Sequence, residues 1–364
     1  MIKNSKQPTR AVFAFVAAAL LVSLPLGKAL QFAYFPYHAG TQSSTIIEVQ
    51  KGISPNDLTK KLVSHGVISS GKDFIWLGRL TRQWGRVKAG EYQVSPGMSP
   101  MQIFSTLTSG ISVIYPITVR EGENLYEIAE SLADKKLINS PEEFTRLCFD
   151  QEFIASFPRF KDAPPKSLEG FLFPDTYNFN HSLTKYDIAR QMVRHFFDYW
   201  KAEHDTRSAT LGMTPSQIIT LASMIERETG APEERPLISS VFYNRIRKKM
   251  RLQSDPTTIY GIWKRYRGNL LKADLMEKNE YNTYQVPGLP VGPISNPGAL
   301  AIQAALYPTQ SSFLYFVSHN DGTHEFTSTY EAHLAAVRKF QLDPKAREGK
   351  SWRDLAKKTN PKKE

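Results

Sequence analysis

The sequence predicts an α+β protein with a single N-terminal transmembrane helix, two small strand–helix–helix modules and a larger mixed α/β domain. Three observations support this: a charge-free apolar run near the N-terminus, a segment that occurs twice, and a capped helix followed by loops rich in Gly, Pro and amides. The 364 residues suit two or three domains, and 41% hydrophobic and 22% charged residues are ordinary for a folded protein. Disordered chains, collagens and disulfide scaffolds are therefore excluded.

The apolar run occupies residues 11–27, AVFAFVAAALLVSLPLG, and contains no charge. A bilayer span needs about 17–25 such residues. Three basic side chains and no acid precede the run, which predicts a cytoplasmic tail (1–10), a membrane anchor (11–30) and a body outside the cytoplasm. The alternative is a cleaved signal peptide, for which residues 27–29, Gly-Lys-Ala, are a poor cleavage site.

The net charge of +11 is concentrated at the two ends of the chain. The tail, residues 341–364, holds eight Lys or Arg against four Asp or Glu. The body between the ends is only mildly basic, so we expect no nucleic-acid partner. Its charge suits an anionic partner such as a membrane surface or a cell-wall polymer. We expect the tail to be a frayed or helical extension and assign it no function.

Residues 46–77 and 116–147 align without a gap. Each copy predicts a short strand, a turn at a glycine and two amphipathic helices, the second opened by a serine N-cap. A strand over 90–94 and a helix from Ser99 to Ser109 are expected between the copies. The modules are placed at residues 41–115 and 116–165. The aligned pairs include Val49/Val119, Gly52/Gly122, Leu62/Leu132, Ser70/Ser140 and Phe74/Phe144.

The second copy opens with TVREGENLYEIA, residues 118–129, and resembles a LysM module, a βααβ fold that binds N-acetylglucosamine chains. Glu123 stands where that family usually has aspartate, and Asn124 where it has threonine or serine. The alternative is that both copies are packing modules without affinity for sugar.

A capping box of Thr214 and Gln217, with a proline between them, opens a helix that continues to Gly230. At 100° per residue, Glu226 and Glu228 lie on opposite rims of its apolar face. A carboxyl group rimmed by aliphatic side chains is partly desolvated, which raises its pKa and suits a general acid. The helix angle does not separate the two glutamates, and a solvated charge run is the alternative.

Three later segments, residues 250–261, 281–298 and 314–326, are rich in Gly, Pro, amides, hydroxyls and aromatics. Amides and hydroxyls bind sugar or peptide groups, and aromatic faces stack on sugar rings. The segments therefore suit a groove for a polar polymer, although such residues also cap loops and fill cores.

LEGFLFPDTY, residues 168–177, looks like the signature of the MltG (YceG-like) endolytic murein transglycosylases. LASMIERET, residues 221–229, resembles the catalytic helix of that family, and LQSDPTTIYG, YNTY, GLPVGPISNPG and DGTHEF follow in the family's order. Val291 replaces the second proline of the family's GLPPGPI. The resemblance covers residues 46–340 and identifies 166–340 as the catalytic domain.

The resemblance implies cleavage of the β-1,4 bond between N-acetylmuramic acid and N-acetylglucosamine in nascent peptidoglycan, leaving 1,6-anhydro ends. One glutamate serves both proton transfers, and no metal or cofactor takes part. By motif position Glu226 is the catalytic residue, with Glu228 as the second choice. The implied partners are glycan strands, the cytoplasmic (inner) membrane crossed once, and peptidoglycan synthases. The catalytic body would be periplasmic or otherwise extracytoplasmic.

Further residues of the matching motifs are candidates for substrate binding, and loop architecture is the alternative role of each. Asn296, for example, fixes the GPISNPG turn or binds an N-acetyl group. The candidates are Gln253, Ser254, Asp255, Tyr281, Asn282, Thr283, Tyr284, Asn296 and His324.

Other classes of protein fit less well. His319, His324 and His333 suggest zinc, but HExxH is absent and the single cysteine, Cys148, forms no cysteine cluster or internal disulfide. There is no GxSxG for a serine hydrolase. A non-catalytic wall-binding scaffold and a lysozyme-like hydrolase stay open. The hydrolase would yield reducing rather than anhydro ends.

Overall fold

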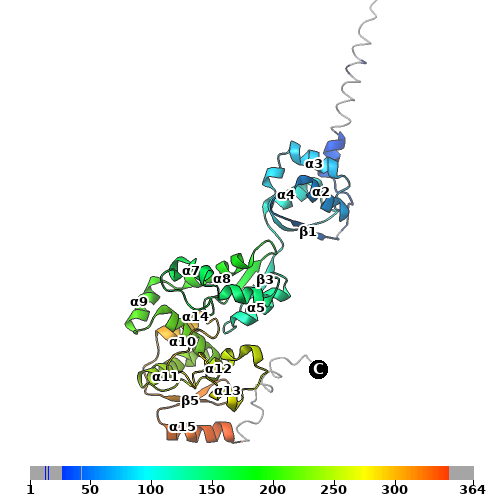
Figure 1. Ribbon diagram of the computed structural model, residues 1–364. Coiled ribbons are helices and arrows are strands. Elements are labelled where there is room, and N and C mark those ends of the chain that lie inside the picture. Colours follow the sequence, from blue (N-terminus) through cyan, green and yellow to red (C-terminus); the bar gives the residue numbers. More distant parts are fainter. Residues whose placement is uncertain (1–12, 14, 16–26, 42, 344–364) are drawn as a thin grey trace, which may run out of the picture. The chain divides into compact units, whose positions relative to one another are not determined.

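The computed structural model describes residues 13, 15, 27–41 and 43–343, and it confirms an α+β protein of helices and small sheets (Figure 1). The chain divides into two compact units. The N-terminal unit contains the described residues up to 115 together with 178–183, and the C-terminal unit contains residues 116–177 and those from 184 onward. Each unit is described by itself below.

The N-terminal unit is a two-stranded antiparallel sheet with helices packed on it. Its elements are β1 (Thr45–Val49), α2 (Pro55–Ser64), α3 (Gly71–Leu80), the short 3-10 helix η1 (Trp84–Arg86), β2 (Gly90–Val94) and α4 (Pro100–Ser109). β1 pairs with β2, with Ile47 opposite Tyr92. Tyr92 and Phe74 are fully buried in its core, where Phe74 stacks on Phe104 with ring centroids 4.1 Å apart. The predicted strand and helix between the two copies are therefore confirmed.

The two copies of the repeat have helices at equivalent positions. α5 (Leu125–Asp134) begins 70 residues after α2, and α6 (Pro141–Cys148) begins 70 residues after α3. The predicted serine caps are confirmed, because Ser70 and Ser140 each accept a hydrogen bond from the backbone N–H three residues on. The repeat is thus expressed as the same local structure twice.

The C-terminal unit is mainly helical. Strand β3 (Tyr115–Thr118) pairs with β4 (Thr176–Phe179), and each of these strands has residues in both units. Within the C-terminal unit, β5 (Tyr315–Ser318) pairs antiparallel with β6 (His324–Thr327). Its helices, beside α5 and α6, are α7 (Gln151–Ala155), α8 (Lys185–Tyr199), α9 (Ala202–Thr210), α10 (Pro215–Glu228), α11 (Arg235–Arg247), α12 (Asp255–Gly261), α13 (Lys272–Met276), α14 (Ala299–Leu306) and α15 (Tyr330–Val337). Short helical turns are η2 (Pro158–Phe160), η3 (Pro232–Glu234), η4 (Trp263–Arg265) and the π-helical η5 (Arg338–Leu342).

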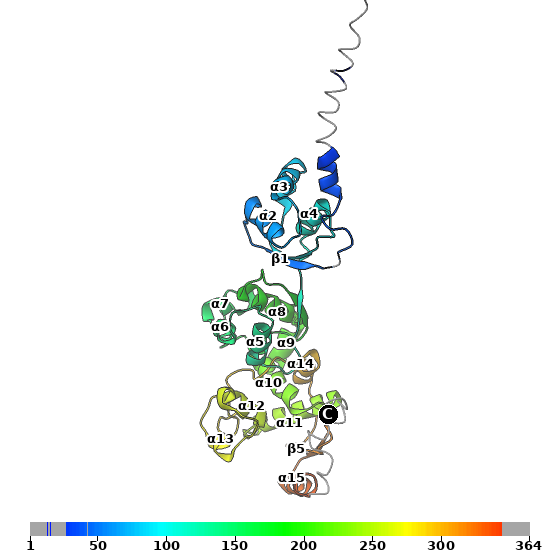
Figure 2. The same ribbon diagram turned by 90° about the vertical axis from the view of Figure 1, so that its right-hand side faces the viewer.

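Helix α10 is the centre of this unit. It packs against α9, α11, α12 and α14, and α10 lies beside α11 and α14 in both views (Figures 1 and 2). The predicted capping box of Thr214 and Gln217 is confirmed. The sequence predicts one apolar face, but every residue from Ile218 to Ile225 is buried. The reason is that neighbours surround the helix, so Ser223 is also enclosed and accepts a hydrogen bond from the Ile294 N–H at 3.0 Å.

One predicted domain border does not coincide with the division into two compact units. The sequence predicts a border at 165/166, whereas residues 116–177 and 184 onward form one unit. Bonds across that border explain this: the Glu169 carboxylate accepts the Leu125 N–H at 3.0 Å. No helix among the described residues is long and apolar enough to cross a membrane. Most of the predicted anchor, and the tail from residue 344, lie outside the described residues.

Candidate active site

The last turn of α10 carries two glutamates with different surroundings. The helix ends at Glu228, and the next residue, Thr229, is already extended. Glu226 and Glu228 are separated by two positions, or about 200° around the helix, so their carboxyl groups contact different elements. The environments of the two side chains therefore decide what each one can do.

Glu226 is held in a buried ion pair. Its side chain is 4% exposed, and its Oε1 lies 2.6 Å from Nη2 of Arg235, itself 8% exposed. Its Oε2 accepts the backbone N–H of Gly298 at 2.9 Å. Both oxygens are thus occupied by groups that hold α10 to the starts of α11 and α14. A carboxylate bound in this way links elements, and with 4% of its side chain exposed it is poorly accessible to a substrate.

Glu228 has the properties of a proton donor. It is partly buried, and its Oε1 accepts the hydroxyl of Ser254 at 2.5 Å. Burial raises the pKa of Glu228 to about 7; the Ser254 hydrogen bond opposes that rise, and the nearby charge of Asp255 adds to it. A carboxyl group with a pKa near the working pH is suited to general acid–base catalysis. Of the two glutamates, Glu228 therefore matches the chemistry that the sequence assigns to this helix.

Ser254 is positioned by a buried network of hydroxyl groups. Its backbone N–H donates to Thr283 Oγ1 at 2.9 Å, and Thr257 Oγ1 lies 2.8 Å from the same oxygen. Thr283 and Thr257 are fully buried. Asn282 is 1% exposed and its amide bonds three backbone carbonyls of residues 274–277. Thr283 therefore positions Ser254, Asn282 holds the 274–277 segment, and both side chains are closed to a substrate.

The side chains of Asp255 and Tyr284 lie beside this network. The Tyr284 hydroxyl donates to Asp255 Oδ1 at 2.6 Å, and Asp255 is exposed. Gln253 is also exposed, with a left-handed backbone (φ 49°) that turns the chain just before Ser254. These three candidates thus share the Glu228 neighbourhood and reach the surface.

Asn296 fixes the GPISNPG turn, which is the first of its two expected roles. The side chain is fully buried. Its Nδ2 donates to the Glu123 carbonyl at 3.0 Å and to Glu169 Oε1 at 2.9 Å, while its Oδ1 accepts the Leu172 N–H at 2.9 Å. Every polar atom of the amide is occupied, so the geometry does not favour contact with an N-acetyl group.

Glu169 is a residue that the sequence reasoning did not single out. It is fully buried, and burial raises its pKa to about 8, against the hydrogen bond from Leu125. The only sequence signal was its place in the LEGFLFPDTY motif. Arg235, the partner of Glu226, was missed as well, because an isolated arginine in a helix has no distinguishing pattern.

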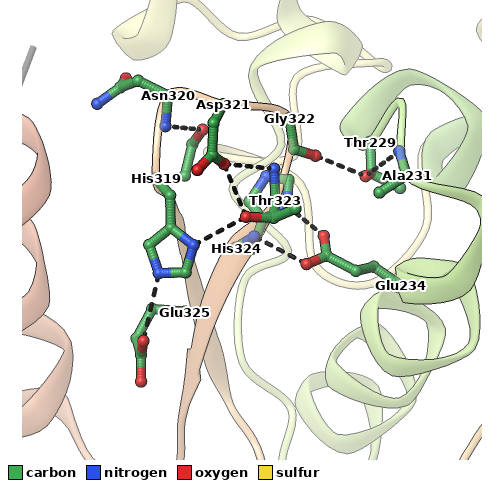
Figure 3. Close-up of polar contacts among 11 residues, drawn as sticks. Thr229, Ala231, Glu234, His319, Asn320, Asp321, Gly322, Thr323, His324 and Glu325 are labelled. Atoms are coloured by element: carbon green, nitrogen blue, oxygen red, sulfur yellow. Dashed lines mark hydrogen bonds and ion pairs between the residues drawn. The ribbon is translucent and has the colours of Figure 1, made fainter. Parts of the chain in front are cut away.

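His324 belongs to the hairpin of β5 and β6, which reaches the end of α10 (Figure 3). Its Nδ1 lies 2.7 Å from Glu234 Oε2, and its backbone N–H donates to the other oxygen at 2.9 Å. The Thr229 hydroxyl, next to Glu228, donates to the Gly322 carbonyl at 3.5 Å. The His324 side chain is 8% exposed, so it anchors the hairpin beside the glutamate helix.

The three histidines that suggested zinc do not converge. His319 contacts Thr323 and Glu325, and His324 contacts Glu234 (Figure 3). The His333 ring stacks on Tyr315 instead. Among the described residues there is no group of three or more His, Cys, Asp or Glu side chains that could hold a metal ion.

Tyr281 stands apart from the other candidates. It lines a cavity of about 850 Å³ with Tyr126 and Tyr260, and its ring meets the Tyr260 ring edge-on at 4.7 Å. Neither Glu226 nor Glu228 lines that cavity. The sequence candidates therefore divide into a cluster at Glu228, buried supports, and one aromatic cavity.

A partly buried carboxyl group that is bonded to Ser254 and has a raised pKa is suited to acid–base catalysis. The comparison with known proteins is more specific. Residues 47–339 match the YceG-like family, and the chain belongs to that family.

Individual relatives agree with this membership. The chain is 33% identical over 320 residues to the endolytic murein transglycosylase of Bacillus subtilis (strain 168), covering 84% of this chain and 87% of that protein. It is 27% identical over 355 residues to the endolytic murein transglycosylase of Streptococcus pneumoniae serotype 2 (strain D39 / NCTC 7466), and the match spans 88% of this chain but 64% of the relative. A crystal structure of a YceG-like protein from Listeria monocytogenes has a TM-score of 0.55 and 31% identity, and covers 81% of this chain and 100% of that one.

Proposed function

We propose that this protein is an endolytic murein transglycosylase in which Glu228 carries the proton transfers. Family membership and the names of the relatives support the reaction class. The single observation that supports the assignment of Glu228 is its partly buried carboxyl group, bonded to Ser254, with a pKa of about 7. Glu226, which motif position favoured, is proposed instead as a structural link to Arg235.

The reaction needs one carboxyl group in two protonation states. Protonated Glu228 donates its proton to the oxygen that leaves C1 of N-acetylmuramic acid. The resulting carboxylate takes the proton from the C6 hydroxyl of the same sugar, whose oxygen bonds to C1. The products are an N-acetylglucosamine end and a 1,6-anhydro end, and the acid is regenerated. Water is not consumed, which distinguishes this route from the two-carboxylate glycosidases.

The surroundings of the enzyme are part of the proposal. The apolar run at 11–27 supports a single-pass anchor in the cytoplasmic membrane, with the catalytic body outside the cytoplasm. An enzyme that cuts nascent strands at the membrane works near the synthases that make them, so we propose these as partners.

The βαα pattern of both repeats supports LysM-like modules. Exposed Gln253 and Asp255, with Tyr284, are proposed to contact the glycan beside Glu228.

Mass spectrometry of cleavage products tests the reaction and the residue together. The substrate is uncrosslinked nascent glycan, and the enzymes are the wild type, Glu228→Gln and Glu226→Gln. We expect 1,6-anhydro ends from the wild type and a loss of at least about 100-fold for Glu228→Gln, because positioned proton transfer contributes 10²–10⁴-fold. Reducing ends would indicate a hydrolase, and no cleavage by the wild type would favour the scaffold.

Thermal unfolding of the same variants separates chemistry from structure. Glu226→Gln removes the shorter ion pair of the buried Arg235 and leaves it only Glu121 Oε2, at 3.9 Å. Loss of one partner of a buried ion pair typically costs about 3–5 kcal/mol. We expect this variant to melt earlier, and its folded fraction to keep cutting at a higher rate than Glu228→Gln. The reverse order of activity, with Glu226→Gln folded and inactive, would return the catalytic role to Glu226.

A further inference from the structure

Two cavities adjoin on the face of the C-terminal unit formed by α5, α6 and α12. One has a volume of about 850 Å³ and the other of about 840 Å³, and both are lined by Tyr126 and Phe149. The first continues along the end of α12 to Tyr260 and Tyr281, and the second continues along α6 and past Trp263. Because they share two lining residues, the cavities are adjacent, and the two together are called here the aromatic groove.

Aromatic rings dominate the floor of the aromatic groove. The Tyr126 ring is nearly parallel to the Trp263 ring, at 14° and 6.2 Å between centroids, and lies 5.9 Å from the Tyr260 ring. Phe149 is 39% exposed, and Tyr126, Trp263 and Tyr281 are each partly exposed. Ring faces open to solvent in a concave site are suited to stacking on sugar rings, whereas isolated core aromatics are enclosed.

Charged side chains rim the aromatic groove, with an excess of cations. Three acids stand against five basic residues, which are Arg146, Arg251, Lys264, Arg267 and Lys278. Exposed charges around a lined groove attract a ligand of opposite sign. A purely apolar ligand would leave these charges without a counterpart, so the lining favours a polar polymer that carries carboxylates.

Helix α12 connects the aromatic groove to the glutamate site. Its N-terminal residue, Asp255, follows Ser254, which bonds Glu228, while Tyr260 and Gly261 at its other end line the groove. Seven residues of helix are about 10 Å long. A chain molecule bound in the groove is therefore about one short helix away from the proposed proton donor, and neither cavity contains Glu228 itself.

We propose that the aromatic groove binds a stretch of the glycan strand remote from the bond that is cut, with sugars on the aromatic rings and stem-peptide carboxylates at the cationic rim. This inference rests on the proposed function for the identity of the glycan. Binding in the groove would give the enzyme a second contact with the same strand. This second contact would explain why cleavage takes place inside long strands rather than at their ends.

Binding to the full chain carrying Glu228→Gln tests the aromatic groove without turnover. The probe is soluble uncrosslinked glycan with its stem peptides, measured by calorimetry. Adding Trp263→Ala should weaken binding by about tenfold, which equals about 1.4 kcal/mol. The matched control is Tyr330→Ala, because Tyr330 on α15 is an aromatic residue that is 55% exposed and lines neither cavity. Equal affinities of the Trp263→Ala and Tyr330→Ala variants would overturn the proposal that the groove binds glycan.

Charge reversal gives an independent readout that does not disturb the aromatic floor. Lys278 is exposed and lines the groove, whereas Lys272 is exposed, nearby in sequence and lines neither cavity. Lys278→Glu should weaken binding of stem-bearing glycan about threefold to tenfold and leave amidase-treated, stem-free glycan unchanged, while Lys272→Glu changes neither. The proposal that the cationic residues bind stem carboxylates would be contradicted if Lys278→Glu and Lys272→Glu weakened binding equally. It would also be contradicted if Lys278→Glu weakened binding of the stem-bearing and the stem-free glycan equally.

Product analysis keeps the two proposals distinct. If the wild type releases anhydro ends and Trp263→Ala cuts long strands with an unchanged KM, the proposal of glycan binding in the groove is wrong and the proposed transglycosylase function is retained. If the wild type cuts nothing while the Glu228→Gln protein binds glycan through Trp263, glycan binding in the groove is retained and the proposed function is wrong. The expected result is a KM raised about tenfold on long strands, with kcat unchanged.

Discussion

At the scale of single residues, the two glutamates of α10 differ in what satisfies their oxygens. Glu226 meets a guanidinium and a backbone N–H, which together occupy both oxygens. Glu228 meets one hydroxyl and the negative charge of Asp255. Burial and the charge of Asp255 raise the pKa of Glu228, against the Ser254 hydrogen bond. The contrast supports the proposal that Glu226 has the structural task and Glu228 the chemical one.

The pH dependence of cleavage follows from the state of Glu228. The first step needs the protonated acid, and the pKa is about 7, so kcat/KM should fall as pH rises above about 7. In the wild type, the hydrogen bond from Ser254 favours the carboxylate and lowers the pKa of Glu228. Ser254→Ala removes this bond and should therefore raise that pKa. Because hydrogen bonds to charged groups contribute about 1.5 kcal/mol or more, the alkaline limb should move up by about one pH unit. A pH–rate profile of both proteins checks this, and a limb that stays or moves down contradicts it.

Glu169 gives a stability that depends on pH. Its pKa is about 8 in the folded protein and about 4.3 in an unfolded chain, so between those values the folded state binds more protons. Stability from this group is complete below about pH 4 and is lost as pH rises through 8. Between pH 5 and 8, the free energy of unfolding of the wild type should fall relative to Glu169→Gln by about 1 kcal/mol or more.

Urea unfolding at pH 5 and pH 8 measures that difference. The control is Glu203→Gln, since the Glu203 side chain is 76% exposed on α9. If the free energy of unfolding changes equally for the wild type and Glu169→Gln between the two pH values, the prediction that Glu169 is buried in its protonated form is wrong.

At the scale of elements, the position of α10 depends on close contacts with the loops around it. Gly170 is one such contact, with φ +85° and its missing Cβ facing Pro293 and Ile219. A Cβ there would lie 2.6 Å from Pro293 Cγ and 2.7 Å from Ile219 Cγ2. The LEGF turn can therefore approach α10 only because residue 170 has no side chain.

Gly170→Ala should destabilise the C-terminal unit by about 2–5 kcal/mol. A left-handed backbone costs about 1–2 kcal/mol for a residue with a Cβ, and overpacking adds about 1–3 kcal/mol. Gly212 is the matched control, because its φ is +68° and nothing lies within 4 Å of its Cβ position. Gly212→Ala should show the backbone cost alone. Equal losses in urea unfolding would show that packing against α10 does not matter.

The elements of the repeat were the most predictable part of the fold. Their signals are local: Ser70 and Ser140 cap helices through bonds three residues away, and Gly110 ends α4 with φ +77°. The burial of α10 on all sides was not predictable in the same way. It results from packing against α9, α11, α12 and α14 together, and α14, the main neighbour of α10, is distant from it in the sequence.

At the scale of the whole molecule, the proposed anchor determines where the enzyme works. We expect the full chain to stay in the membrane fraction after carbonate extraction, because residues 11–27 form a charge-free apolar run behind a basic tail. A chain starting at residue 28 should be released into the soluble fraction and keep cutting uncrosslinked glycan. Release of the full chain by carbonate would favour the cleaved signal peptide, provided that its mass shows the loss of residues up to about 29.

The sequence by itself determined the α+β class, the repeat, the helix caps and the family, because these depend on short-range patterns and on several motifs in a fixed order. It also brought the choice of catalytic residue down to two glutamates. Tertiary structure decided between their environments, since Arg235, Gly298 and Ser254 approach α10 from three different segments. It likewise enclosed Asn296 and Thr283 and brought Tyr126 beside Trp263. Proton affinity and access depend on what surrounds a side chain in space, and spacing along the chain does not contain that information.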